Sequence, residues 1–213
     1  GRVTVEGGII EYELANGSVP TFIAAGPDGN MWTTSGTSAN MIHKISTTGQ
    51  LLESYDIGSE LNGMTGLGLA AGPDGNMWIN AGYPNGSLNG KILKITPDGE
   101  ITVYPVTRGG VGIAPGPDGN MWFSVSSSSD QVSYIGKITM DGAVTEYGLP
   151  GNGDGAGMLT AGPDGNMWYL RNPTADNKIG KITMDGQVEE FDLPIGALGY
   201  YGIAAGPNEQ VWI

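Results

Sequence analysis

Cysteine is absent from the 213 residues, and histidine occurs only once. Without cysteine the chain has neither disulfides nor thiolate chemistry, and its redox compartment stays open. Basic residues are also few: nine lysines and arginines stand against 22 aspartates and glutamates, which gives a net charge of −13. Because such a surface repels phosphate backbones and anionic membranes, we expect neither nucleic acid nor a membrane as a partner.

Long apolar runs are missing as well. No stretch approaches the roughly 18 apolar residues that a membrane-spanning helix needs. The strand-like start at Gly1 gives no indication of a signal peptide, and we expect none in this chain. We therefore expect a soluble chain, with its compartment left open. Glycine, by contrast, is abundant, with 38 residues spread between short apolar stretches. This distribution is typical of many tight turns between short strands.

An internal repeat covers the whole chain. The segment GPDGNMW occurs four times and a related segment, GPNEQVW, once; they begin at Gly26, Gly72, Gly116, Gly162 and Gly206, 44 or 46 residues apart. Periods of roughly 40 to 50 residues are those of propeller blades and helical-pair solenoids. Because no long stretch has an apolar period of 3.6 and Gly-Pro-Asp-Gly interrupts a helix, the repeat favours an all-β propeller.

One full repeat, residues 66–106, reads as four short strands. GLGLAAG and NMWIN flank the turn PDGN, and after a variable loop GKILKIT and EITVYPV flank the turn PDG. Four antiparallel strands per repeat match a propeller blade. We therefore predict internal blades at about residues 20–57, 66–106, 111–150 and 157–194, within a single domain that covers residues 1–213.

The two ends of the chain carry complementary parts of a fifth repeat. Residues 1–15 follow the third- and fourth-strand pattern of residues 136–150, whereas residues 200–213 follow the first- and second-strand pattern. Joining them in one sheet closes the ring and removes two open strand edges. The sequence thus predicts a monomeric five-bladed β-propeller whose ring is closed by N- and C-terminal half-blades.

Alternate turns of a propeller emerge on opposite faces. The short first-to-second and third-to-fourth turns, such as residues 27–30 and 97–99, nearly repeat between blades, and we call their face the turn face. Their Asp, Asn and Gly suit tight turns. No stretch has the ligand spacing of an EF-hand, so no metal site is predicted. The longer second-to-third loops and the blade-to-blade connections form the variable-loop face, where a rigid scaffold commonly carries function.

The variable-loop face, around the central channel, is the predicted place for a small-molecule ligand whose identity the sequence leaves open. Its loops are rich in Ser, Asn, Gly and Tyr, which supply stacking and hydrogen-bonding groups. The candidate ligand-binding residues are Tyr83, Tyr134, Tyr169, Tyr200, Tyr201, Asn80, Arg108 and Arg171. The alternative is that these loops are polar only because water surrounds them.

Each repeat also carries a tryptophan on its second strand and a basic residue on its third. The fixed position of the tryptophans beside Met or Val fits packing between sheets better than an aromatic cage. The basic residues, Arg2, Lys44, Lys94, Lys137 and Lys181, are interpreted as a solvated stripe. His43 lies on a third strand and is interpreted as a surface or packing residue, so no catalytic residue is assigned.

The pattern GPDGNMW…IGKIT-x-DG-x-x-x-EY resembles the blades of the virginiamycin B lyase (streptogramin B lyase) family, most closely at residues 135–139 and 179–183. The resemblance implies a propeller, seven-bladed in the family, that linearises a cyclic depsipeptide by magnesium-assisted elimination. The family's Glu-x-His-Gly run before a first strand has no counterpart in the five repeats. Its glutamate beyond a second strand is also missing, because Ser35, Ala81, Val125 and Arg171 stand there.

Three functions from different classes stay open. The first is a non-catalytic propeller, without a cofactor, that binds a small molecule or another partner through the variable-loop face. The second is a magnesium-dependent C–O lyase of the resembled family with a rearranged site. The third is a scaffold without a ligand, such as a shortened, recently amplified or designed propeller, which the four identical GPDGNMW segments favour.

Overall fold

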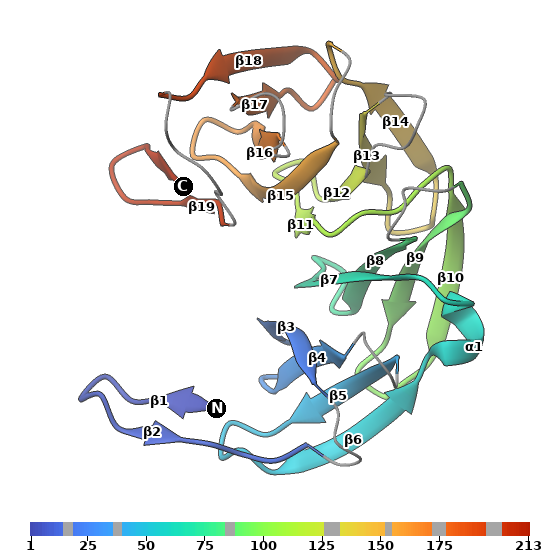
Figure 1. The fold of residues 1–213 in the computed structure, drawn as a ribbon, viewed down its shortest axis with the longest axis vertical. Helices are drawn as coiled ribbons and strands as arrows, with labels where there is room; N and C mark the ends of the chain where they lie inside the picture. The colour runs from blue at the N-terminus through green and yellow to red at the C-terminus, as the bar shows by residue number, and fades with distance from the viewer. Residues whose placement is uncertain are drawn as a thin grey trace.

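The fold is all-β, as the repeat predicts, apart from one short helix (Figure 1). The computed structural model describes residues 1–14, 19–35, 40–83, 88–125, 133–151, 155–171, 178–194 and 202–213. Within these ranges, four sheets of four antiparallel strands and two sheets of two strands follow one another along the chain. Consecutive strands are neighbours in every sheet, so each internal repeat forms one blade of a propeller.

The first two blades are joined by the helix. Blade 1 contains β3 (Pro20–Ala25), β4 (Met31–Ser35), β5 (Met41–Ile45) and β6 (Leu51–Asp56). Blade 2 contains β7 (Thr65–Ala71), β8 (Met77–Gly82), β9 (Gly90–Ile95) and β10 (Ile101–Val106). Helix α1 (Gly58–Leu61), which the sequence did not predict, ends at Asn62 in the left-handed region, with φ of 49°. Its Leu61 is fully buried, so this connection contributes to the core between the two blades.

The next two blades repeat this arrangement without a helix. Blade 3 contains β11 (Ile113–Pro115), β12 (Met121–Val125), β13 (Tyr134–Ile138) and β14 (Val144–Gly148). Blade 4 contains β15 (Ala156–Ala161), β16 (Met167–Arg171), β17 (Lys178–Ile182) and β18 (Val188–Asp192). Strand β11 has only three residues and ends at Pro115, which has no N–H to donate to the ladder.

The two half-repeats form separate hairpins. The N-terminal hairpin consists of β1 (Arg2–Val3) and β2 (Ile9–Ile10), and the C-terminal hairpin consists of β19 (Ala204–Ala205) and β20 (Val211–Trp212). Each is a two-stranded sheet of its own, and no pairing between the two occurs among the described residues. Figure 1 shows the N-terminal hairpin beside blade 1 and the C-terminal hairpin beside blade 4, on the two sides of an opening in the ring.

The apolar core lies between successive blades, in three clusters that follow the chain. Trp32, Trp78 and Trp122 are fully buried in these clusters, which confirms the predicted packing role of the tryptophans. Trp212 is different, because 60% of its surface is exposed on the C-terminal hairpin. A tryptophan is therefore buried where another blade follows its own.

The turns have the geometry that their sequences predict. In each PDGN turn the glycine has a φ of 76° or 77°, a left-handed conformation that residues with a Cβ rarely adopt. The aspartate binds its own backbone two residues on: Asn120 donates its backbone N–H to Asp118 over 3.2 Å. These short turns fix the ends of the strands on the turn face.

Candidate functional site

The structure describes six of the eight predicted ligand-binding residues, and it distributes them over blades 2, 3 and 4, with Asn80, Tyr169, Arg108 and Arg171 buried. Tyr200 and Tyr201 lie outside the described residues. Of the other six, Tyr169 and Arg171 are brought together by direct contacts to one group, the carboxylate of Glu190.

Asn80 is a structural residue in this arrangement, because its side chain is fully buried between blades 2 and 3. Its amide nitrogen donates to the carbonyl oxygens of Gly112 and Ser124, over 2.9 and 2.8 Å. Its amide oxygen accepts from the backbone N–H of Gly110 over 3.1 Å. Asn80 thus satisfies the backbone of the connection into blade 3. Its polar atoms are engaged within the protein, and no part of its side chain faces solvent.

Arg171, Glu190 and Tyr169 form a buried polar group in blade 4. The Nε of Arg171 lies 3.4 Å from Glu190 Oε1, and Nη2 donates to the carbonyl oxygen of Pro150 over 2.8 Å. Tyr169 donates its hydroxyl to the same carboxylate oxygen over 3.0 Å. Burial, with the charge of Glu190, raises the pKa of Tyr169 above its usual range. The phenol therefore stays protonated and acts as a hydrogen-bond donor.

Two tyrosines keep part of their surface accessible near the ends of their strands. Tyr83 directly follows β8 and packs against the core between blades 1 and 2, with its hydroxyl 3.5 Å from the carbonyl oxygen of Asn62. Tyr134 begins β13 and packs against the core between blades 2 and 3. Arg108 lies in the connection between those blades and is only 6% exposed. The partly exposed rings of Tyr83 and Tyr134 remain available for stacking.

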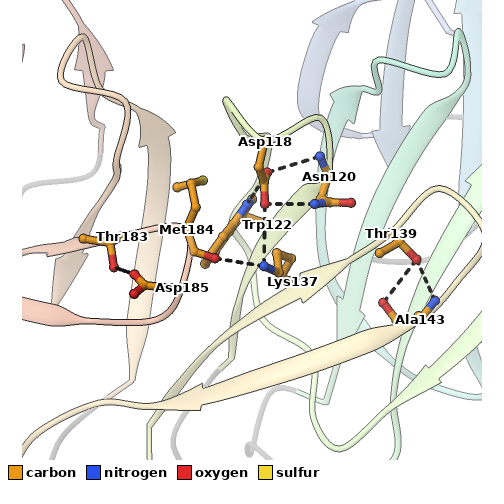
Figure 2. Close-up of polar contacts among 9 residues, drawn as sticks. All are labelled: Asp118, Asn120, Trp122, Lys137, Thr139, Ala143, Thr183, Met184 and Asp185. Carbon is orange, nitrogen blue, oxygen red and sulfur yellow. Dashed lines mark hydrogen bonds and ion pairs between the residues drawn. The ribbon is translucent and has the colours of Figure 1, made fainter.

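The turn face carries a repeated polar unit that sequence reasoning identified only in part (Figure 2). In blade 3, Asp118 accepts hydrogen bonds from the indole N–H of Trp122 over 3.0 Å and from the side-chain amide of Asn120 over 2.8 Å. The ammonium of Lys137 lies 3.6 Å from the same carboxylate and 5.2 Å from the centre of the Trp122 ring. It also donates to the carbonyl oxygen of Met184 in blade 4, over 2.9 Å.

The interpretation of the basic residues as a solvated stripe is therefore wrong for the lysines, which are partly buried, whereas Arg2 is exposed as predicted. The side chains of Lys44 and Lys137 are only 12% and 18% exposed, because each lysine lies directly across the strand pair from a tryptophan and over its ring. Sequence spacing already contained the signal: the tryptophan and the lysine recur in every repeat, on neighbouring strands. The lysine side chains were expected in solvent because their acceptor is a backbone carbonyl oxygen of the next blade. The sequence of one repeat gives no sign of that contact.

These contacts also hold the aspartates in the charged form. Burial opposes ionisation of Asp28, but hydrogen bonds from Asn30, Trp32 and Lys44 outweigh it and lower the pKa well below its usual range. The pKa of Asp118 is lowered in the same direction: burial again opposes the shift, and hydrogen bonds from Asn120 and Trp122 exceed it. The aspartates therefore remain charged partners of the lysines throughout the ordinary pH range.

His43 was interpreted as a surface or packing residue, and the structure shows that it is a packing residue. It lies on β5, is 1% exposed, and its Nδ1 is 2.8 Å from the hydroxyl of Ser54. Its Nε2 is buried without a hydrogen-bond partner in the described part of the chain. Burial lowers the pKa of His43 below its usual value, because a charged imidazole loses its hydration there.

We expect the stability of the protein to decrease as the pH falls from 7 to 5. The folded state holds His43 neutral, whereas the unfolded state binds a proton near pH 6.5, so acid favours unfolding. One such proton contributes at most about 1.4 kcal/mol per pH unit. Chemical denaturation at several pH values measures this slope, and the His43→Gln variant serves as the control. An equal slope in both proteins would assign the effect to other groups.

Two further features concern possible metals and membranes. Within the ranges that the structure describes, no group of three or more His, Asp or Glu side chains is close enough to hold a metal ion. No helix in these ranges is long and apolar enough to cross a bilayer.

Comparison with known proteins gives one family. A family model described as the virginiamycin B lyase family matches residues 1–108 and, again, residues 85–213. A solved structure described as a streptogramin B lyase is 30% identical, with a TM-score of 0.81 over 99% of this chain and 67% of that chain. A search of curated proteins gives no match.

Two further structures show how far the likeness extends. A catalytically inactive virginiamycin B lyase from Staphylococcus aureus, solved with quinupristin, is 30% identical, with a TM-score of 0.83 over 99% of this chain and 68% of that chain. A structure described as a putative gluconolactonase is 18% identical, with a TM-score of 0.56 over 91% of this chain and 68% of that chain, and it shares the fold alone. This chain thus spans about two thirds of the length of the lyases.

Proposed function

From the premise that the chain belongs to the virginiamycin B lyase family, we propose that it is a non-catalytic propeller that binds a small cyclic peptide on its variable-loop face. The observation that carries the ligand class is the 30% identical relative solved with quinupristin, whose fold matches 99% of this chain. A shared blade architecture alone is a weak warrant for function, since propellers serve many activities.

The side chains of this chain support binding without elimination chemistry. An elimination needs a base that reaches an α-proton of the bound peptide. The only histidine, His43, is buried on β5 with its Nδ1 against Ser54. The last position of the second strand of blade 4 is held by Arg171, and the nearby carboxylate of Glu190 accepts from Tyr169 and pairs with Arg171. This carboxylate is therefore engaged by two partners of its own blade.

Binding itself is supported by the two accessible tyrosines. Tyr83 and Tyr134 come from blades 2 and 3, and both rings are anchored on one side by the core. An anchored ring offers a flat apolar surface at little cost in side-chain entropy. Of the predicted ligand-binding residues, Tyr83 and Tyr134 are therefore the two that we propose to contact the peptide.

The proposal takes the ring as five-bladed and closed, with the two hairpins forming the fifth blade, as the sequence predicts. Closure within one chain keeps the protein monomeric and surrounds one central channel with the variable loops. With five blades that channel is narrower than in a seven-bladed relative, because ring diameter increases with the number of blades. A peptide then rests on the mouth of the channel.

We expect quinupristin to raise the unfolding temperature of the protein whether or not Mg²⁺ is present. A ligand that binds only the folded state stabilises it by about 2.7 kcal/mol at one hundred times its dissociation constant. Differential scanning fluorimetry with quinupristin, with Mg²⁺ alone and with EDTA measures this. A midpoint that quinupristin leaves unchanged at saturating concentration would contradict the proposal.

The Tyr83→Ala variant locates the site. Loss of one stacking ring is expected to weaken quinupristin binding by about two- to thirteenfold, because aromatic contacts contribute about 0.5–1.5 kcal/mol. Val144→Ala is the matched control, since Val144 is a partly exposed apolar residue on the outer strand β14. Equal affinities of the two variants would place the ligand elsewhere.

The lyase remains the second candidate, since the two 30% identical structures are described as lyases. Elimination opens the peptide ring without a change in mass, so chromatographic retention of quinupristin is the appropriate readout. Conversion that requires Mg²⁺ would favour the lyase over the non-catalytic propeller.

A further inference from the structure

The tripeptide Leu-Asn-Gly occurs twice in the chain, at residues 61–63 and at residues 88–90. The first copy follows helix α1 in the connection between blades 1 and 2, and the second leads into β9 of blade 2. In both copies the asparagine is exposed and lies in the left-handed region, with φ of 49° at Asn62 and 73° at Asn89. The two copies differ in how the structure holds the glycine that follows.

Gly63 is exposed, and no heavy atom beyond its chain neighbours lies within 4 Å of a Cβ added to it. Within the described residues, neither its backbone N–H nor the side chain of Asn62 makes a hydrogen bond. The chain is anchored on both sides, because Leu61 and Met64 are 0% and 2% exposed, and Met64 donates its N–H to the carbonyl oxygen of Leu61 over 3.0 Å. The peptide group between Asn62 and Gly63 is therefore able to turn without disturbing the core.

Gly90, in the second copy, is held in place by its neighbours. It is buried on β9, where it pairs with Val106 of β10. A Cβ added to it would lie 2.0 Å from the backbone nitrogen of Gly109, in the connection that leaves blade 2. Asn89 donates its backbone N–H to the carbonyl oxygen of Thr107 over 2.9 Å. Turning the peptide group between Asn89 and Gly90 therefore requires part of the sheet to open.

An asparagine followed by glycine reacts when the backbone nitrogen of the glycine reaches the side-chain carbonyl carbon. Glycine presents the least hindered backbone nitrogen, since it has no Cβ. The reaction is intramolecular, so its rate depends on how often the two atoms meet in the correct orientation. For Asn62 and Gly63 this requires rotation about ψ of Asn62, away from its value of 45°. No contact of Gly63 opposes that rotation within the described residues.

We propose that Asn62 is a site of spontaneous deamidation, which the fold favours over the second Leu-Asn-Gly copy. The nitrogen of Gly63 bonds to Cγ of Asn62, and the bond from Cγ to the side-chain nitrogen breaks. The amide proton of Gly63 leaves with that nitrogen as ammonia, and a cyclic imide, a succinimide, remains. Water then opens the succinimide at either carbonyl carbon. The product is aspartate or isoaspartate, and the proton of its new carboxylic acid passes to the ammonia, so water is the only co-reactant.

The modification changes the surroundings of Tyr83. The Tyr83 hydroxyl lies 3.5 Å from the carbonyl oxygen of Asn62, which belongs to the peptide group that turns. Isoaspartate adds a methylene group to the main chain between the buried anchors Leu61 and Met64. Either product also adds a negative charge at the C-terminal end of α1, where the helix carbonyls disfavour it. The effect on the ligand rests on the proposed function: if Tyr83 contacts the peptide, deamidation weakens binding.

Peptide mapping of aged protein tests the site, because both copies lie in one tryptic peptide, residues 45–91. The folded protein is incubated at mildly alkaline pH, and fragment-ion mass spectrometry measures the conversion at each asparagine. We expect Asn62 to be converted at least about tenfold faster than Asn89, since breaking a hydrogen bond and its packing lowers the reactive population by about that factor. Protein held in urea is the control, and there both copies are expected to react at the same rate.

Three results of the mapping would overturn the proposal: equal rates in the folded protein, faster conversion of Asn89, or conversion of Asn62 in urea alone. Three other Asn-Gly pairs, which begin at residues 16, 85 and 152, lie outside the described residues. The conversion is assigned to individual positions, so these pairs are separated from Asn62 in the same experiment.

Quinupristin affinity before and after ageing tests the effect on the ligand. We expect the affinity to fall as Asn62 is converted, by no more than the loss in Tyr83→Ala. The Asn62→Gly variant is the matched control, because glycine tolerates the left-handed conformation and has no side-chain amide to lose. Its affinity is expected to stay constant, and an equal loss in both proteins would overturn the link to Asn62. Fresh protein that does not bind quinupristin would contradict the proposed function alone, since the mapping needs no ligand.

Discussion

Replacing Trp122 by alanine is expected to lower the free energy of unfolding by about 3–5 kcal/mol, the usual cost of removing a large buried aromatic side chain. Trp122 is fully buried between blades 3 and 4, and it stacks on Tyr147. Its indole N–H also donates to Asp118, so the variant removes a donor from a carboxylate that stays charged. Denaturant unfolding, followed by circular dichroism, measures the change.

The Trp212→Ala variant is the matched comparison, because it removes the same side chain from an exposed position. With 60% of its surface exposed, Trp212 contributes little as long as the C-terminal hairpin is undocked. If the two terminal hairpins form a fifth blade, the cost approaches that of Trp122→Ala. A loss below about 1 kcal/mol for Trp122→Ala itself would contradict the packing role of the repeated tryptophans, because surface substitutions are usually that small.

The Gly142→Ala variant is expected to lose about 3 kcal/mol of unfolding free energy, for two reasons that add. Gly142 has φ of 96°, where a residue with a Cβ is strained by about 1–3 kcal/mol. The new Cβ would also lie 2.2 Å from the ring of Tyr104. That ring stacks on Trp78 at 5.8 Å and cannot move without disturbing the core between blades 2 and 3. Thermal and denaturant unfolding both report the loss.

Gly7→Ala separates the two contributions. Gly7 occupies the same position in its turn and has a similar φ of 85°, but no atom lies within 4 Å of an added Cβ. Its variant therefore carries the backbone strain without the contact, as long as Phe191 does not cover it. Equal losses of unfolding free energy at both positions would have one of two explanations. Either backbone strain alone accounts for the loss, or a side chain such as Phe191 lies against Gly7 as Tyr104 lies against Gly142.

The blade structure could be predicted from sequence because every cause of it lies within one repeat. Alternating residues in GKILKIT, glycines at left-handed turn positions and the tryptophan beside Met are local signals. Helix α1 escaped prediction because four residues are too few for an apolar period, and it is stabilised by burial of Leu61 rather than by its own sequence.

The site was harder to predict because burial decides which polar residues reach solvent. Asn80 and Tyr169 stand in loop-like or strand-end sequence, as Tyr83 does. The structure buries the first two and engages their polar atoms inside the protein. Lys137 illustrates the opposite error, since a charged residue was expected in water and instead lies over Trp122. Contacts that cross from one repeat to the next are invisible in the spacing of a single repeat.

The acceptor of each bridging lysine is a main-chain oxygen, supplied by Pro97, Met140 or Met184. The identity of the turn residue is therefore irrelevant to recognition, and substitutions there leave the bond intact. When a gene gains or loses one whole repeat, two blades become neighbours that were not neighbours before. One of them carries the lysine and the other the main-chain carbonyl oxygen, so the same contact can form between them. Copy number in such a lineage can change by recombination in single steps, with no second mutation needed to restore the fit.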